Sequence, residues 1–268
     1  MPPSAPHHAS RRYCTRPKDP SAGHHAFNWS DKLNAANDQL VEELNDAIFE
    51  FDADPDLQVV ILSGAGRAFC SGADVHQRQL RPLEEMRRLG GPASRRSRGG
   101  GLGDTVNWKP AIAAVHGYAF GLGYAWMQAC DLIVVAEGTK LQITEVQRGL
   151  GGAQHWATAW FWTGDRFANE LALTGRLFTP EEALQHGMVN RVVPREDLMA
   201  TAEALANQIA ENPPLSVRAN VRMIRWFVAQ MQRETHLYTQ GLGLHLSEDF
   251  RESARAFAEK RRPVFKGR

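Results

Sequence analysis

Apolar residues recur along this chain in two spacings, one typical of amphipathic helices and one typical of buried strands. After Asn37, which suits a helix N-cap, they repeat every three to four positions until Asp54-Pro55 stops the pattern. The residues of this stripe are Leu40, Leu44, Ile48 and Phe51. Residues 57–62 then form a nearly continuous apolar run, as expected of a strand that helices cover on both faces.

The same two patterns predict the remaining elements. Short apolar runs predict strands at residues 111–115, 132–135, 140–143 and 189–193. Helical spacing predicts helices at residues 74–79, 154–162, 166–173 and 180–186. Behind Pro213-Pro214, a longer helix carries a stripe of Val217, Val221, Ile224, Val228 and Met231. We therefore expect an α/β core over residues 28–195 and a C-terminal helical subdomain over residues 196–268.

Residues 1–27 follow neither spacing. They are rich in Pro, Ser, His and Arg, which predicts a disordered or atypical leader. The leader has neither the apolar centre of a signal peptide nor the amphipathic face of a transit peptide. No cysteine or carboxylate partners accompany His7, His8, His24 and His25, so we interpret them as solvated polar residues and predict no metal site.

Charge and cysteine content narrow the possible functions. A formal net charge of +1 over 268 residues argues against binding to nucleic acid or to a membrane surface. No apolar run reaches the length of a membrane span. The three cysteines, Cys14, Cys70 and Cys130, show no metal-ligand spacing, so we expect reduced thiols in a cytoplasmic protein.

Two glycine-rich corners, residues 59–74 and residues 113–125, carry the candidate chemistry. Each corner begins as a buried strand and ends in small residues where a helix starts. Small residues let a ligand approach the backbone closely, and the first N–H groups of a helix are free to donate hydrogen bonds. Two such corners can direct two N–H donors at one oxygen, which predicts an oxyanion site.

In these corners the chain resembles the crotonase, or enoyl-CoA hydratase/isomerase, superfamily. Other segments follow in the order that this family shows, namely Asn34-Ala35, residues 139–145, Leu173-Thr174-Gly175, residues 183–193 and residues 257–267. The resemblance covers roughly residues 28–268. It implies a crotonase-like ββα spiral core, closed by the C-terminal helices and assembled as a homotrimer or a dimer of trimers.

The resemblance is weakest at the start of the chain. Members of the family usually begin with a strand hairpin that leads to Asn-Arg-Pro, and here only Asn28 matches, followed by Trp29 and Ser30. We therefore expect that the first hairpin is missing or that the leader replaces it.

The family's chemistry implies an acyl-CoA thioester as substrate. Matched by position, the backbone N–H groups of Ala73 and Leu122 would hold the thioester oxygen, and Glu145 would act as acid and base. The first glutamate of the family's hydratases falls at Ala125, which cannot carry a proton. The resemblance therefore implies an isomerase or an atypical hydratase. Four residues could stand in for the missing glutamate: His76, Tyr124, Gln154 and His155.

Coenzyme A would be part of the substrate, so no separate cofactor is implied. By the same resemblance, the residues that bind the substrate are Ala68, Cys70, Ser71, Gly72, Asp74, Gly121, Phe257 and Lys260. Asp74 also suits an N-cap, and Cys70 a small core position. The arginines of residues 81–107 fit either a mobile solvated loop or a contact to the coenzyme phosphates.

Two other functions compete with that of an enoyl-CoA hydratase or isomerase. A dinucleotide-binding protein would carry a third glycine where this chain has Phe69, and no acidic residue ends a following strand at the required distance, so we reject it. An acyl-CoA-binding relative that has lost its chemistry is consistent with Ala125 and stays open.

Overall fold

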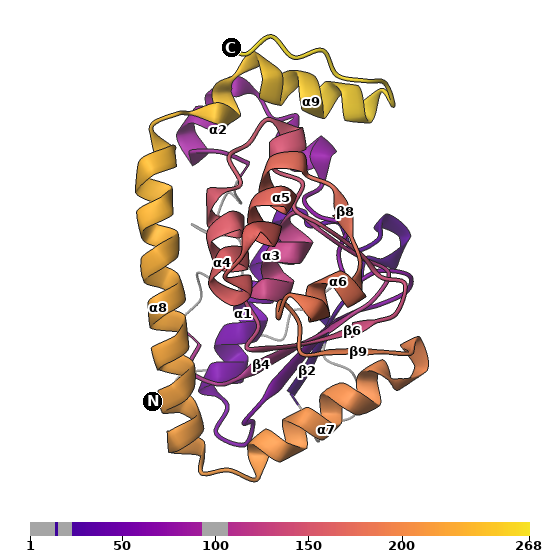
Figure 1. Cartoon of the computed structure of the whole chain (residues 1–268), viewed down its shortest axis with the longest axis vertical. Helices are drawn as coiled ribbons and strands as arrows, with labels where there is room; N and C mark the ends of the chain where they lie inside the picture. Colours follow the sequence, from indigo (N-terminus) through magenta and orange to yellow (C-terminus); the bar gives the residue numbers. More distant parts are fainter. Residues whose placement is uncertain (1–13, 16–22, 93–106) are drawn as a thin grey trace, which may run out of the picture.

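The computed structural model describes residues 14–15, 23–92 and 107–268, and its centre is a six-stranded sheet (Figure 1). In spatial order the strands are β1 (Cys14–Thr15), β2 (Gly23–Phe27), β3 (Val60–Gly64), β4 (Ala111–Val115), β6 (Leu132–Ala136) and β9 (Arg191–Val193). Neighbouring strands are parallel except β1 and β2, which pair antiparallel. A second, three-stranded sheet consists of β5 (Tyr118–Phe120), β7 (Lys140–Gln142) and β8 (Leu177–Phe178).

Helices cover both faces of the main sheet, α1 and α3 on one face and α7 on the other. In the described residues the α-helices are α1 (Asp38–Ala53), α2 (Leu83–Leu89), α3 (Leu122–Gln128), α4 (Ala153–Thr163), α5 (Arg166–Thr174), α6 (Pro180–Gln185), α7 (Leu198–Ala210), α8 (Pro214–Gln240) and α9 (Glu248–Ala258). Shorter helical turns are η1 (Ser30–Lys32), the π-helix η2 (Val75–Gln79), η3 (Val146–Arg148), η4 (Arg195–Asp197) and η5 (Leu244–Leu246). In the described part of the chain, no helix combines the length and apolar character that crossing a membrane requires.

Alternate strand residues face two different apolar layers. Val60 and Leu62 of β3 pack with α1 and α3, whereas Ile61 packs on the opposite face with α7. This confirms the predicted strand, buried on both faces, for residues 60–62; residues 57–59 precede the strand, which spans Val60–Gly64. Since α7 contributes Leu198 to this core, the C-terminal helical segment begins as part of the main sheet's packing.

Beyond α7, the chain leaves the sheet and runs along the side of the molecule. Figure 1 shows α8 as a long helix beside α4, with α9 at its far end. Arg225 of α8 binds Asp131 at 2.6 Å and also donates to the carbonyl groups of Asn107 and Lys109. These contacts fix the middle of α8 to the turn between α3 and β6.

The helix predicted after Asn37 is confirmed as α1, and the Asn37 side chain accepts a hydrogen bond from the N–H of Leu40. The predicted cap at Asp74 is also confirmed, since its carboxylate accepts from the N–H of Gln77. The predicted strands and helices occur with end points shifted by a few residues.

The prediction of a disordered or atypical leader over residues 1–27 was wrong for its last residues, Gly23–Phe27. Gly23–Phe27 form β2, which pairs with β3 along its whole length, and β1 pairs with β2, so a first hairpin is present. The other residues of the predicted leader lie outside the described part. Phe27 is the one strongly apolar residue of β2, and it packs on Phe69 and Trp126. Strand β2 is held mainly by backbone pairing, which leaves little apolar pattern to recognise.

The interpretation of His24 and His25 as solvated residues was also wrong. His24 Nε2 lies 2.8 Å from Ser63 Oγ, and His25 is buried. His7 and His8 lie outside the described residues. No group of three or more metal-ligating side chains occurs among residues 14–15, 23–92 and 107–268.

Candidate active site

The first corner leads from β3 into the π-helix η2. Ala36 N–H donates to Gly72 O at 2.7 Å and Asp74 N–H donates to Ala36 O at 3.0 Å, which fixes Ala73 between them. The N–H of Ala73 itself has no acceptor within the described residues. Gly72 has a φ of +102°, a conformation that L side chains rarely adopt. The backbone of this corner therefore presents a free donor at Ala73.

The second corner leads from β5 into α3. Gly121 has a φ of +47°, and its N–H donates to Gln142 O at 3.1 Å. Leu122 is the first residue of α3, so its N–H has no partner inside the helix. Its N–H also finds no acceptor elsewhere in the described part of the chain.

The two corners touch each other through their backbones. Phe120 N–H donates to Cys70 O at 3.1 Å, and a Cβ added to Gly72 would lie 3.0 Å from Phe120 O. A Cβ added to Gly123 would lie only 2.3 Å from Cys70 O. Glycine is thus required at position 123 for this approach. The structure brings together the two segments that carry Ala73 and Leu122.

Glu145 lies beside the second corner, directly before η3. A Cβ added to Gly121 would lie 3.4 Å from Glu145 Oε1. The same oxygen lies 3.2 Å from His155 Nε2 of α4. The Glu145 side chain is 13% exposed, and Oε2 is buried without a hydrogen-bond partner among the described residues. Glu145 therefore combines one oxygen held by His155 with one that is buried and has no side-chain partner.

The two groups shift each other's ionisation. Burial disfavours the charge on Glu145, but the nearby His155 outweighs this effect, so the pKa of Glu145 lies below its ordinary value. Burial also disfavours the charge on His155, yet the Glu145 carboxylate raises the pKa of His155 above its ordinary 6.5. The pair favours a carboxylate facing an imidazolium.

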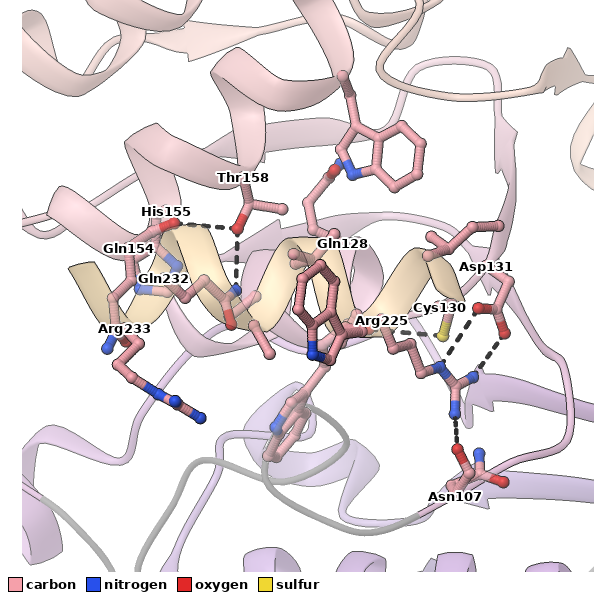
Figure 2. A pocket seen from close by; sticks show the side chains of 18 of the residues that line it. Asn107, Gln128, Cys130, Asp131, Gln154, His155, Thr158, Arg225, Gln232 and Arg233 are labelled. Atoms are coloured by element: carbon pink, nitrogen blue, oxygen red, sulfur yellow. Dashed lines mark hydrogen bonds and ion pairs between the residues drawn. The ribbon is translucent and has the colours of Figure 1, made fainter. Parts of the chain in front are cut away.

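A cavity of about 900 Å³ opens beside this pair, between α3, α4 and α8 (Figure 2). Leu122, Ala125 and His155 all line it. The small Ala125 side chain therefore leaves room where the family's hydratases carry a glutamate, and His155 borders the same space.

The four possible substitutes for that glutamate lie in different environments. His155 lines the cavity and contacts Glu145. Gln154 also lines the cavity, and its side chain is exposed. Tyr124 also lines the cavity, but its hydroxyl lies 3.7 Å from Met188 Sδ, and burial raises the pKa of Tyr124. His76 is exposed within η2. The geometry therefore favours His155.

The residues predicted to bind the substrate fall into two groups. Ala68, Cys70, Ser71, Gly72, Asp74 and Gly121 lie in or next to the touching corners. Burial raises the pKa of the Cys70 thiol to about 12, so Cys70 contributes backbone groups and packing. Phe257 and Lys260 lie at the end of α9, where the Arg148 guanidinium lies 4.1 Å from the centre of the Phe257 ring.

The arginines of residues 81–107 do not share one environment. Arg81 is buried and binds Asp38 at 2.6 Å, so it is neither part of a solvated loop nor free to bind a phosphate. Arg87 lies in α2, 3.6 Å from Glu84. Arg95, Arg96 and Arg98 lie outside the described residues.

Two cavity residues were missed by sequence reasoning. Gln128 ends α3 and Asn107 precedes β4, and both are buried amides that line the cavity. The available signal was a glutamine on a helix that is otherwise nearly apolar.

Known proteins resemble this chain over most of its length. The sequence profile described as enoyl-CoA hydratase/isomerase matches residues 26–268. A carnitinyl-CoA dehydratase of Salmonella typhi is 35% identical over 251 residues, covering 88% of this chain and 92% of that protein. A mevalonyl-coenzyme A hydratase of Aspergillus fumigatus is 35% identical over 222 residues, covering 81% and 80%.

A solved structure, the carnitinyl-CoA hydratase from Mycobacterium avium, superposes with a TM-score of 0.81 at 31% identity and covers 97% of this chain and 100% of its own. The match extends from β2 to the C-terminal residue, so it includes both corners, the cavity and the C-terminal helices. The chain has the crotonase fold and belongs to the enoyl-CoA hydratase/isomerase family.

Proposed function

We propose that this protein is a hydratase or dehydratase that adds water to, or removes it from, the acyl chain of a coenzyme A thioester. The observation that carries this proposal is the contact of 3.2 Å between Glu145 Oε1 and His155 Nε2 beside the cavity at Ala125. Hydration and dehydration need two groups that move protons, and this pair supplies both. The names of the relatives, carnitinyl-CoA dehydratase and mevalonyl-coenzyme A hydratase, support the same reaction class.

The backbone N–H groups of Ala73 and Leu122 would hold the thioester oxygen. Negative charge grows on that oxygen when the α-proton leaves, so donors fixed in advance stabilise the transition state more than the bound substrate. The free N–H groups and the contact between the two corners support this role. A leucine side chain at 122 does not interfere with a donor that belongs to the backbone.

In the dehydration direction, the Glu145 carboxylate would take the proton from the α-carbon of a 3-hydroxyacyl thioester. The electron pair of that C–H bond becomes the enolate, with its charge on the thioester oxygen. The enolate then forms the α,β double bond as the C–O bond at the β-carbon breaks, and the His155 imidazolium protonates the departing hydroxyl to give water. Both groups regain their starting protonation by exchange with solvent, and hydration is the reverse sequence.

Isomerisation is a second candidate, because Ala125 removes the glutamate that the family's hydratases use. Glu145 alone could move a proton between two carbons of an enoyl thioester. Solvent oxygen separates the two reactions, since hydration in H₂¹⁸O places ¹⁸O on the β-carbon and isomerisation incorporates none.

Other parts of the proposal concern the coenzyme and the assembly. Coenzyme A enters as part of the substrate, its adenosine end near residues 68–73 and its phosphates near Phe257 and Lys260. Exposed apolar side chains such as Trp226, Phe227 and Leu237 on α8 support burial in a homotrimer or a dimer of trimers. The buried, unpaired thiols of Cys70 and Cys130 fit a cytoplasmic location.

The test is turnover of a panel of 3-hydroxyacyl, 2-enoyl and 3-enoyl coenzyme A thioesters, with thioester affinity measured in parallel. Water addition or loss that requires Glu145 supports the proposal. Binding without conversion of any of these thioesters would instead make the protein an acyl-CoA-binding relative without catalysis.

A further inference from the structure

The cavity contains buried amide groups that no part of the described chain satisfies. Gln128 is 5% exposed, and both its Oε1 and its Nε2 are buried without a hydrogen-bond partner. Asn107 is 2% exposed, and its Nδ2 is also unpartnered. Both residues line the cavity, and Figure 2 shows Gln128 among the side chains at its centre. A buried amide without a partner is costly, so these atoms indicate a missing ligand group.

The position of Gln128 relates it to the proposed reaction centre. It follows Ala125 by three residues, so both lie on the same face of α3. It follows Leu122 by six residues, which corresponds to about 9 Å along the helix axis. Helical side chains lean toward the N-terminus of their helix, so the Gln128 amide is directed back toward Ala125. An acyl chain whose carbonyl lay at Leu122 would bring its γ- to ε-carbons near this amide.

The two atoms of the Gln128 amide narrow the chemistry of that group more than the charges around the cavity do. Three arginines line the cavity: Arg225 is neutralised by Asp131 at 2.6 Å, Arg222 lies over the Trp108 ring, and Arg233 borders the cavity as well. A carboxylate on the acyl chain would accept a hydrogen bond from Gln128 Nε2 but would leave Oε1 without a donor. A cationic group would donate to Oε1 but would leave Nε2 without an acceptor. A group that both donates and accepts satisfies the two atoms together.

We propose that the acyl group carries a neutral hydroxyl or carboxamide at its γ- to ε-carbon, and that the Gln128 side-chain amide binds it. This inference rests on the proposed function, because it assumes that an acyl thioester occupies the cavity. Apolar neighbours such as Trp162 and Ile224 would enclose the rest of the chain. Gln128 is then the residue that distinguishes this acyl group from a plain hydrocarbon.

The test compares pairs of 2-enoyl-CoA thioesters that carry either a hydroxyl or a methyl group at carbon 4, 5 or 6. For each pair, kcat/KM is measured for the wild type and Gln128→Met, and Kd is measured in the Glu145→Gln background with and without the methionine change. Methionine has a similar length to glutamine but no strong hydrogen-bonding atoms. The matched control is Gln208→Met on the exposed face of α7.

The wild type should prefer at least one hydroxylated thioester over its methyl partner by about 10- to 100-fold, because binding the methyl group leaves the amide unpaired. Gln128→Met should abolish that preference in both kcat/KM and Kd, and Gln208→Met should keep it. The melting temperature of Gln128→Met should not fall, because no hydrogen bond within the protein is lost.

Equal use of both members of every pair, unchanged in Gln128→Met, would overturn the inference and indicate that water satisfies the amide. A fall in melting temperature without a change in preference would also overturn it, since Gln128 would then be a packing residue. Failure of the proposed function has a different signature, because no thioester would be converted while the Kd comparison would still decide the role of Gln128.

Discussion

His155 Nε2 lies 3.2 Å from Glu145 Oε1, and the two side chains form a largely buried pair with no net charge when both are ionised. Such a pair can persist in a site that excludes most water, because each charge compensates the burial of the other. The two residues come from the segment after β7 and from α4, so the contact depends on how α4 packs against that segment.

Replacing Glu145 by glutamine should reduce turnover about 10²- to 10⁴-fold, because the group that takes the α-proton is lost. Thioester affinity should stay within a few-fold of the wild type, since the backbone donors and the cavity are unchanged. Steady-state kinetics and calorimetric binding measure the two effects. Wild-type rates in this variant would remove Glu145 from the mechanism.

His155 should titrate above 6.5 in the wild type and below 6.5 in Glu145→Gln. The carboxylate raises the pKa of His155 against the effect of burial, and in the variant only burial remains. NMR titration of the imidazole signals gives both values. A His155 pKa that does not fall in the variant would show that the contact with Glu145 does not govern it.

The same shifts determine how stability depends on pH. The folded pKa of His155 is raised, so its contribution is complete below its unfolded value of about 6.5 and is lost as pH rises through the folded pKa. The pKa of Glu145 is lowered, so its contribution is present above its unfolded value and is lost as pH falls through the folded pKa. The pair should therefore stabilise the fold most between these limits. The free energy of unfolding, measured by urea denaturation, should fall more at alkaline pH for the wild type than for His155→Gln.

Ala125→Glu should rescue a variant in which His155 is replaced by alanine. The single change His155→Ala should lower water addition by about 10²-fold or more. A glutamate at 125 would enter the same cavity and could take over the proton transfer at the β-carbon. The measurement is ¹⁸O incorporation from solvent by the single and double variants. Absence of any rescue would show that a group at position 125 cannot reach the substrate.

Gly121→Ala should harm both stability and activity, whereas Gly138→Ala should affect stability alone. Both glycines have positive φ, at +47° and +70°, so an alanine at either site costs about 1–2 kcal/mol. A Cβ at 121 would also lie 2.5 Å from Thr144 Oγ1 and 3.4 Å from Glu145 Oε1, while nothing lies within 4 Å of one at 138. Thermal melts and kcat together test this difference. Equal activities would contradict a close packing of Gly121 against Thr144 and Glu145.

Arg225→Met should destabilise the fold by about 2–4 kcal/mol. It removes the cation that pairs with Asp131, which keeps the N–H of Ala111 as a donor, and it removes the side-chain donor of two backbone carbonyls. The matched control is Arg222→Met, which removes only a contact with the Trp108 ring and should cost less than about 1 kcal/mol. Chemical denaturation measures both. Similar losses would mean that Arg225 does not anchor α8.

Much of the fold could be predicted because local signals and tertiary packing agree. In α1, the Asn37 cap and the stripe from Leu40 to Phe51 coincide with the buried face. The two corners could be recognised because their backbones approach too closely for any residue except glycine, as at Gly123.

Other features depend on contacts between distant segments and leave little trace in the sequence. Strand β2 is stabilised by its pairing with β3, and its sequence of glycine, histidines and alanine does not alternate in hydrophobicity. The substitute for the glutamate missing at Ala125 could be narrowed to four residues, but only the packing of α4 brings His155 next to Glu145. Gln128 lies on an almost apolar helix, and its significance becomes visible only beside the cavity.

Helix α3 is only seven residues long, and both of its ends, Leu122 and Gln128, line the cavity. Its first turn is also held against Cys70 through Gly123. Under the proposed function, the side chain at position 128 would select among acyl groups, while the backbone donor at Leu122 would hold the enolate oxygen. A side chain can be exchanged without altering a backbone donor, so variants at position 128 offer a route to new substrates that spares the reaction itself.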